Sequence, residues 1–155
     1  MTELYFERLV LEGMQAGLSW LTILKRKEGM TVAFDNFNPE IIAVLYSQEK
    51  IVELLKDERI IRNKLKVNGL VLNARSYLKI QHELGSFSDY IWSFVGHQPI
   101  YNQFRSLEDV PGETAISKVM SKDLKKRGFE FVGPTICYAF IQFVGMVNDH
   151  TIDCF

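Results

Sequence analysis

Residues 124–140, LKKRGFEFVGPTICYAF, combine several groups that could hold a phosphate. Gly133 lacks a side chain, so the backbone there could come close to an anion. The N–H groups near Thr135, at the start of an expected helix, would point toward that anion. A helix, an apolar hairpin and a second helix form the layout of a helix-hairpin-helix motif. Electrostatic attraction would come from three consecutive cations, Lys125, Lys126 and Arg127.

The same stretch also has a purely structural interpretation. Cations in the last turn of a helix are favoured by the helix dipole, and Gly128 is suited to ending that helix. A run of three charges is commonly no more than a solvated helix face. These residues alone therefore leave two interpretations open, contact with nucleic acid or a capped helix end.

A second candidate site lies near the C-terminus. His150 and Cys154, in the sequence HTIDC, are residue types that bind zinc, and they stand four positions apart. A structural zinc requires four ligands, and the chain offers no other His/Cys pair with ligand spacing. Because two ligands alone would bind zinc weakly, we expect no fully coordinated zinc in this chain.

The elements that carry these residues belong to a chain of ordinary globular composition. Of its 155 residues, 47% are hydrophobic and 24% are charged, which predicts a single domain over residues 1–155. The net charge of −1 means that any affinity for nucleic acid must come from a local patch. No apolar run is long enough to span a membrane, and the acidic N-terminus is unlike a signal peptide. With only two cysteines, the chain is expected to be cytoplasmic.

Hydrophobic periodicity predicts helices throughout the chain and an all-α fold. Ser19, Asn38 and Ser47 are expected N-caps, and Pro134 is an expected first helical residue. Residues 96–112 contain two prolines, which is typical of a loop, and no alternating strand exceeds three or four residues. The expected helices are 3–14, 20–28, one from Pro39, one after Ser47, 61–84, one after Ser86 or Ser88, one ending at Gly128 and one from Pro134.

Five blocks of the sequence, in order, resemble the 3-methyladenine DNA glycosylase I family. They are LEGMQAGLSW (11–20), NARSYL (73–78), WSFVGHQP (92–99), LKKRGFEFVGPTICYAF (124–140) and GMVNDH (145–150). The resemblance covers essentially the whole chain, and five ordered blocks are far more specific than any single motif. It implies an all-helical fold of the helix-hairpin-helix glycosylase type and a role in base-excision repair of double-stranded DNA with alkylated bases. The implied reaction is hydrolysis of the N-glycosidic bond of 3-methyladenine after base flipping, without strand cleavage.

The resemblance also implies which residues form the site. Glu12 and Trp20 match positions in the family's base pocket, where a carboxylate would accept hydrogen bonds from the base and an indole would stack on its cationic ring. Taken alone, a Glu in an amphipathic helix is usually solvated and a Trp is usually in the core, so the resemblance carries this assignment. The turn between them, with Gln15, Gly17 and Leu18, is similar to the family's loop that faces the space vacated by the flipped base.

The chain differs from the family's pattern at its N-terminus. The family carries about two dozen further residues before the first helix, including a cysteine and a histidine for a structural zinc and aromatic residues of the base pocket. We therefore expect a truncated homologue with a more open pocket, in which His150 and Cys154 are the remaining half of the zinc site. A monomer is expected, with self-association through apolar surface left by the missing segment as a second outcome. The alternative function is that of a catalytically impaired homologue that acts only as a DNA-binding helix-hairpin-helix domain.

Overall fold

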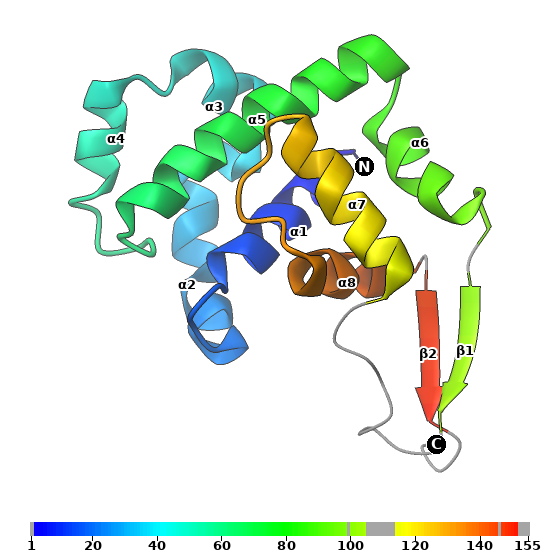
Figure 1. The fold of residues 1–155 in the computed structure, drawn as a ribbon. Coiled ribbons are helices and arrows are strands. Elements are labelled where there is room, and N and C mark those ends of the chain that lie inside the picture. Colours follow the sequence, from blue (N-terminus) through cyan, green and yellow to red (C-terminus); the bar gives the residue numbers. More distant parts are fainter. Residues whose placement is uncertain (1, 99, 105–113, 146, 152–155) are drawn as a thin grey trace.

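A computed structural model describes residues 2–98, 100–104, 114–145 and 147–151, and the side chains of residues 4–98 and 114–145. Helices dominate this part of the chain (Figure 1), which confirms the predicted helical class. The α-helices are α1 (Thr2–Met14), α2 (Trp20–Ala33), α3 (Pro39–Leu45), α4 (Gln48–Leu54), α5 (Lys64–Leu84), α6 (Phe87–Trp92), α7 (Ala115–Lys126) and α8 (Pro134–Phe143). Two 3-10 helices, η1 (Asp35–Phe37) and η2 (Ser93–Val95), follow α2 and α6.

Several helices begin where the sequence predicts a cap. Four side chains accept a hydrogen bond from a backbone N–H in the first turn of α2, α3, α4 and α6, namely Ser19, Asn38, Ser47 and Ser86. The predicted end of α2 is wrong, because this helix continues beyond residue 28 to Ala33. Met30 and Ala33 are buried, so packing of these turns outweighs the cost of Gly29 inside the helix.

Part of the predicted loop forms a strand. β1 (Ile100–Phe104) pairs in parallel with β2 (Val147–Thr151), in register from Ile100 opposite Val147. The prediction of a loop is therefore wrong for β1, whereas residues 105–113 lie outside the described part of the chain. Partners so distant in sequence pair because of tertiary structure, which a short local pattern does not reveal. The two strands project from the helical body close to α8 (Figure 1).

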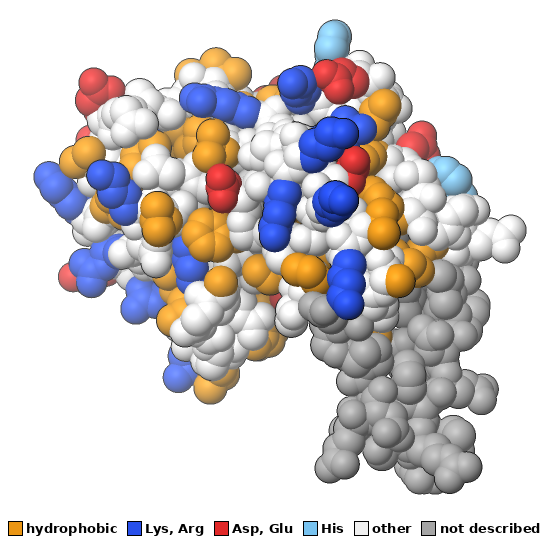
Figure 2. All heavy atoms as spheres, in the orientation of Figure 1, with side chains coloured by type: hydrophobic (Ala, Val, Ile, Leu, Met, Phe, Trp, Pro, Cys, Tyr) orange, Lys and Arg blue, Asp and Glu red, His pale blue; other side chains and the backbone are white. Residues whose placement is uncertain are grey.

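The surface carries its charge unevenly. On the face drawn in Figure 2, Lys and Arg side chains gather over α7. A chain whose net charge is −1 thus carries a local concentration of positive charge on this face. Within the described residues, no helix combines the length and apolar character needed to cross a bilayer.

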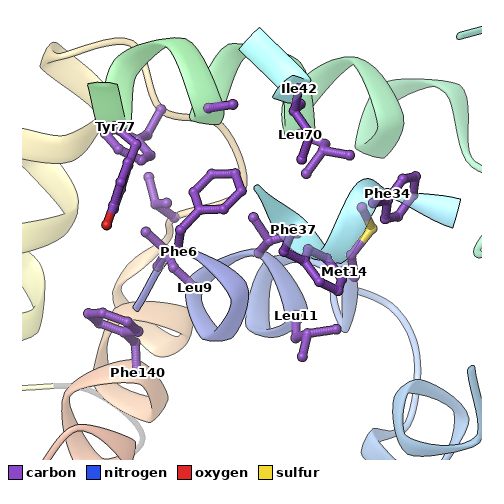
Figure 3. Packing of buried hydrophobic residues seen from close by; sticks show 14 of the residues in the cluster. Phe6, Leu9, Leu11, Met14, Phe34, Phe37, Ile42, Leu70, Tyr77 and Phe140 are labelled. Atoms are coloured by element: carbon purple, nitrogen blue, oxygen red, sulfur yellow. The ribbon is translucent and has the colours of Figure 1, made fainter. Parts of the chain in front are cut away.

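The core is built around α1, which packs against both α5 and α8. Phe6 of α1 meets Tyr77 of α5 with ring centroids 5.3 Å apart, and Tyr5 meets Phe140 of α8 edge-on at 6.2 Å. Figure 3 shows Phe6 beneath Tyr77 in this cluster, with Phe140 below. Residues 9–14, the last turns of α1, are all buried. Side chains at this end of α1 are therefore held by packing on several sides.

Candidate active site

A cavity of about 220 Å³ lies between the C-terminal end of α1, the turn that follows it and the first turns of α8. Its lining residues are Glu12, Gln15, Ala16, Thr135, Ile136 and Ala139. An adjoining hollow is lined by Arg8, Glu12, Gln15, Trp20, Ala139, Gln142 and Phe143. The structure therefore brings together Glu12, Trp20, Gln15 and Thr135 along one continuous depression.

The Glu12 side chain is buried in this depression, with 3% of its surface exposed. Its Oε2 accepts a hydrogen bond from Nε of Arg8 at 3.2 Å, and Nη2 of Arg8 lies at the same distance. Burial raises the pKa of the Glu12 carboxyl, while the charge and the hydrogen bond of Arg8 act to lower it. The site thus contains a carboxylate that is shielded from water and matched by a single cation.

Trp20 lies at the rim of the depression with a cation already against its ring. The guanidinium carbon of Arg8 is 4.4 Å from the centroid of the Trp20 ring and 4.2 Å from that of Phe143. Such distances are typical of a cation–π contact. Arg8 and Phe143 were not predicted from the sequence. The spacing of Arg8 and Glu12, one helical turn apart, was a usable signal for their ion pair, whereas nothing local pointed to Phe143.

The predicted loop between Glu12 and Trp20 is a tight turn. Gln15 accepts a backbone hydrogen bond from the N–H of Leu18 at 2.7 Å, and Gly17 has φ of 80°, a conformation that favours glycine. A Cβ on Gly17 would meet nothing within 4 Å, and Leu18 is exposed. Gln15 and Ala16 of this turn line the cavity, and the two residues that follow present bare backbone and one apolar side chain to solvent.

Lys66 of α5 fixes this turn from the protein side. Its Nζ donates hydrogen bonds to the carbonyl oxygens of Met14, at 2.8 Å, and of Ala16. The side chain is buried, and burial lowers the pKa of its amine. Carbonyl groups at the end of a helix lack partners within that helix, and a cation there is favoured. The sequence analysis gave Lys66 no role, because its partners are distant in sequence.

The predicted helix-hairpin-helix is formed by α7, the connection 127–133 and α8. Gly133 is the N-cap of α8, and no side chain caps the first turn of that helix. A Cβ on Gly133 would meet nothing within 4 Å, and Thr135 is exposed. The start of α8 thus presents its backbone N–H groups on an accessible surface.

The three predicted cations of this motif have different surroundings. Lys125 and Lys126 are exposed. Nε of Arg127 lies 2.9 Å from Oδ2 of Asp123, and its Nη1 lies 3.7 Å from Oε2 of Glu83. Its guanidinium carbon is also 5.1 Å from the centroid of the Tyr90 ring. Arg127 is therefore engaged within the protein, which leaves the two lysines as the exposed cations of the stretch.

Contacts from α1 and α5 anchor the hairpin. Asn73 of α5 is buried; its Nδ2 donates to the carbonyl oxygen of Glu130 at 3.0 Å, and its Oδ1 accepts from the Glu130 N–H at 2.7 Å. Gly13 and Gly69 make room for Phe131, because a Cβ on either glycine would lie 3.0 Å from an atom of that residue. These roles of Asn73 and of both glycines were not predicted from the sequence.

The two predicted zinc ligands lie within and after β2 in the sequence. The backbone of His150 belongs to β2, its side chain is outside the described set, and Cys154 lies outside the described residues. Among described residues there is no group of three or more His, Cys, Asp or Glu that could hold a metal ion. The half-site at His150 and Cys154 therefore stays a prediction.

Comparison with known proteins places this geometry among DNA repair enzymes. A family model described as methyladenine glycosylase matches residues 2–155. The DNA-3-methyladenine glycosylase 1 of Escherichia coli is 46% identical over 149 residues, which is 96% of this chain and 79% of that protein. A solved 3-methyladenine DNA glycosylase I is 45% identical, with a TM-score of 0.93 over 99% of this chain and 84% of its own. The enzyme from Staphylococcus aureus, solved to show how it recognises 3-methyladenine, is 37% identical, with a TM-score of 0.93 over 99% of this chain and 81% of its own.

Proposed function

Because the chain belongs to the methyladenine glycosylase family and is a DNA-3-methyladenine glycosylase, we propose that the depression between Glu12 and Trp20 receives the flipped, methylated base. The activity is hydrolysis of an N-glycosyl bond in alkylated DNA. The observation that carries the proposed site is the pairing of a buried carboxylate with an indole, beside a cavity of about 220 Å³. Both groups already bind a cation, the guanidinium of Arg8.

The chemistry needs little more than recognition of charge. Methylation at N3 gives adenine a positive charge, so the base is already a good leaving group. Glu12 would accept hydrogen bonds from the base and match its charge, and Trp20 would stack on its ring. When the glycosidic bond breaks, its electron pair goes to the base, and a water oxygen bonds to C1′ with loss of one proton. The products are free 3-methyladenine and an abasic site in an uncut strand, as expected of a monofunctional enzyme.

Two surface features support a DNA-binding face around this pocket. The turn with Gln15, Gly17 and Leu18 begins at the cavity wall with Gln15, and we propose that it faces the gap left by the flipped nucleotide. At the helix-hairpin-helix, the N–H groups at the start of α8, near Gly133 and Thr135, would bind a backbone phosphate. Lys125 and Lys126 would attract this phosphate by their charge. Arg127 would contribute mainly by bracing the hairpin.

Other parts of the assignment rest on the sequence. We propose a single glycosylase domain over residues 1–155 that acts as a monomer in the cytoplasm on double-stranded DNA. A zinc ion in this family would be held in part by His150 and Cys154 and would serve a structural role. We favour an active enzyme over the alternative of a catalytically impaired DNA-binding homologue because Glu12 and Trp20 line one depression.

The test is release of free 3-methyladenine from methylated DNA by the wild-type chain and by Glu12→Gln. We expect the variant to lose roughly 10²- to 10³-fold in rate, the usual effect of removing one electrostatic contact to the reacting group. Because the pKa of Glu12 is raised in the folded state, its charged form costs stability as pH rises through that pKa. The neutral variant should therefore keep or raise its Tm at neutral pH.

A matched control is Glu28→Gln, which changes an exposed carboxylate on α2. This control should retain wild-type activity and Tm. Normal base release by Glu12→Gln would remove Glu12 from the site, and loss of fold in that variant would show that the residue is structural.

A further inference from the structure

Arg8 occupies the depression at the place where a planar cation would be bound. Its guanidinium lies against the rings of Trp20 and Phe143, with its carbon 4.4 and 4.2 Å from the two centroids. Two of its nitrogens lie 3.2 Å from Oε2 of Glu12. A flat, delocalised cation stacked on an indole and paired with a carboxylate uses the same two groups that the proposed pocket offers to a methylated base.

We propose that Arg8 is an internal placeholder: its guanidinium occupies the position of the cationic base. A base must displace this guanidinium before the base can occupy the pocket. This inference rests on the proposed base pocket at Glu12 and Trp20. As long as Arg8 holds this position, its positive charge compensates the charge of Glu12. Without Arg8, the Glu12 carboxylate, at 3% exposure, would be buried without a compensating charge.

The position of Arg8 allows such an exchange. Its side chain retains 24% exposure and Phe143 retains 43%, so this edge of the hollow borders solvent. Arginine is long and unbranched, and its charged head can leave the aromatic slot for water without any change in α1. Glu12, by contrast, is fixed within the buried end of the helix.

Displacement of Arg8 costs the same free energy for every ligand, so it lowers the affinity of all ligands equally. The preference for one ligand over another then depends on Glu12 and Trp20. A cationic base replaces both contacts of Arg8, whereas a neutral, undamaged base leaves Glu12 without a matching charge. The same competition by Arg8 also affects product release after the reaction. Once the glycosidic electron pair has moved to the base, the product is neutral, and return of Arg8 to the slot would favour release of that product.

The experiment measures binding of free 3-methyladenine and of adenine by calorimetry, at mildly alkaline pH where both bases are neutral. If only the fraction of protein with Arg8 displaced can bind, removal of Arg8 abolishes this competition. We expect Arg8→Ala to bind both bases on the order of tenfold more tightly than the wild type. Arg8→Lys keeps a charge but not the flat stacking surface, so its affinity for both bases should lie between those of the wild type and Arg8→Ala. Inhibition of base release by added 3-methyladenine should strengthen from the wild type to Arg8→Lys and further to Arg8→Ala.

Two controls separate the possible failures. Arg75→Ala removes an exposed arginine of α5 whose Nε donates a hydrogen bond to the carbonyl oxygen of Ala43 in α3, and this variant should bind like the wild type. Trp20→Ala should weaken 3-methyladenine binding; if it does not, the proposed pocket is wrong and the placeholder falls with it. If Trp20→Ala weakens binding but both Arg8 variants bind no better than the wild type, the proposed base pocket is supported and the proposed role of Arg8 is wrong.

Discussion

Burial and ion pairing act in opposite directions on the Glu12 carboxyl. Burial raises its pKa, and the adjacent Arg8 lowers it. A cationic base is best matched by the ionised carboxylate, so Arg8 helps to keep Glu12 charged before the base arrives. Among described residues that line the depression, Glu12 and Arg8 are the only two with ionisable side chains, which makes their coupling open to test.

We predict that Arg8→Ala shifts the acid limb of the pH profile of kcat/KM toward higher pH. Loss of Arg8 removes the influence that lowers the pKa of Glu12 and leaves the one that raises it. Activity that depends on the carboxylate is present above this pKa and disappears as pH falls through it. The profile can be measured as base release from methylated DNA over the acidic range, with Arg75→Ala as the control that keeps the wild-type limb. An unmoved acid limb in Arg8→Ala would show that this ion pair does not set the ionisation of the active enzyme.

At the scale of elements, the hairpin between α7 and α8 is held in place by its neighbours. Asn73 bonds both backbone groups of Glu130, and Phe131 packs against Gly13 and Gly69. Phe131 has φ of 57°, a conformation that bulky residues rarely adopt, so contacts from α1 and α5 must stabilise it. The surface proposed to bind phosphate therefore depends on residues that touch no DNA.

We predict that Asn73→Ala destabilises the protein by about 2–3 kcal/mol, because it leaves the backbone groups of Glu130 without their partner. DNA binding should weaken to a similar extent for all sequences, since the hairpin loses its fixed position. Urea denaturation and binding to undamaged duplex would measure the two effects. Asn68→Ala, which removes one side-chain hydrogen bond from the same helix to its own backbone, should change both much less. Full stability in Asn73→Ala would exclude this anchor.

We predict that changing Lys125 and Lys126 together to Gln reduces the salt dependence of DNA binding. Each phosphate contact contributes about 0.9 to the slope of log K against log salt concentration, so the slope should fall by about 1.8. Lys56→Gln, which removes an exposed charge just after α4, serves as the control. Arg127→Gln should instead lower stability, because Asp123 and Tyr90 lose a partner. A salt slope unchanged in the double variant would return this stretch to the structural interpretation.

The sequence predicted the features of this fold that are local. Ser19 and Asn38 cap their helices through N–H groups two or three residues away, so the pattern carries the whole interaction. The residues that support the site depend on distant partners. Asn73 and Glu130 are 57 positions apart, and Lys66 and Met14 are 52 apart. No periodicity or spacing encodes such pairs, and the parallel pairing of β1 with β2 escaped prediction for the same reason.

At the scale of the whole molecule, the candidate site is assembled from three segments that the fold brings together. The continuous segment from the end of α1 to the start of α2 supplies Glu12 and Trp20, the start of α8 supplies the opposite wall, and α5 supports both from behind. Because α1 is packed between α5 and α8 (Figure 1), the pocket and the hairpin share one rigid support. Stability and activity should therefore be coupled most strongly through residues of α5 that reach the other two segments.

Lys66 provides the test of that coupling. We predict that Lys66→Met costs about 2–3 kcal/mol, the range for lost hydrogen bonds to a charged group, because the carbonyl oxygens of Met14 and Ala16 lose their donor. The turn that lines the cavity should then lose its fixed position, so kcat/KM for base release should fall even under conditions where the variant is fully folded. Lys64→Met, an exposed lysine of the same helix, is the matched control and should leave both quantities near wild type. A variant at Lys66 that is destabilised but fully active when folded would show that α5 supports the fold alone, and that the geometry of the pocket is set by α1 and α8 without it.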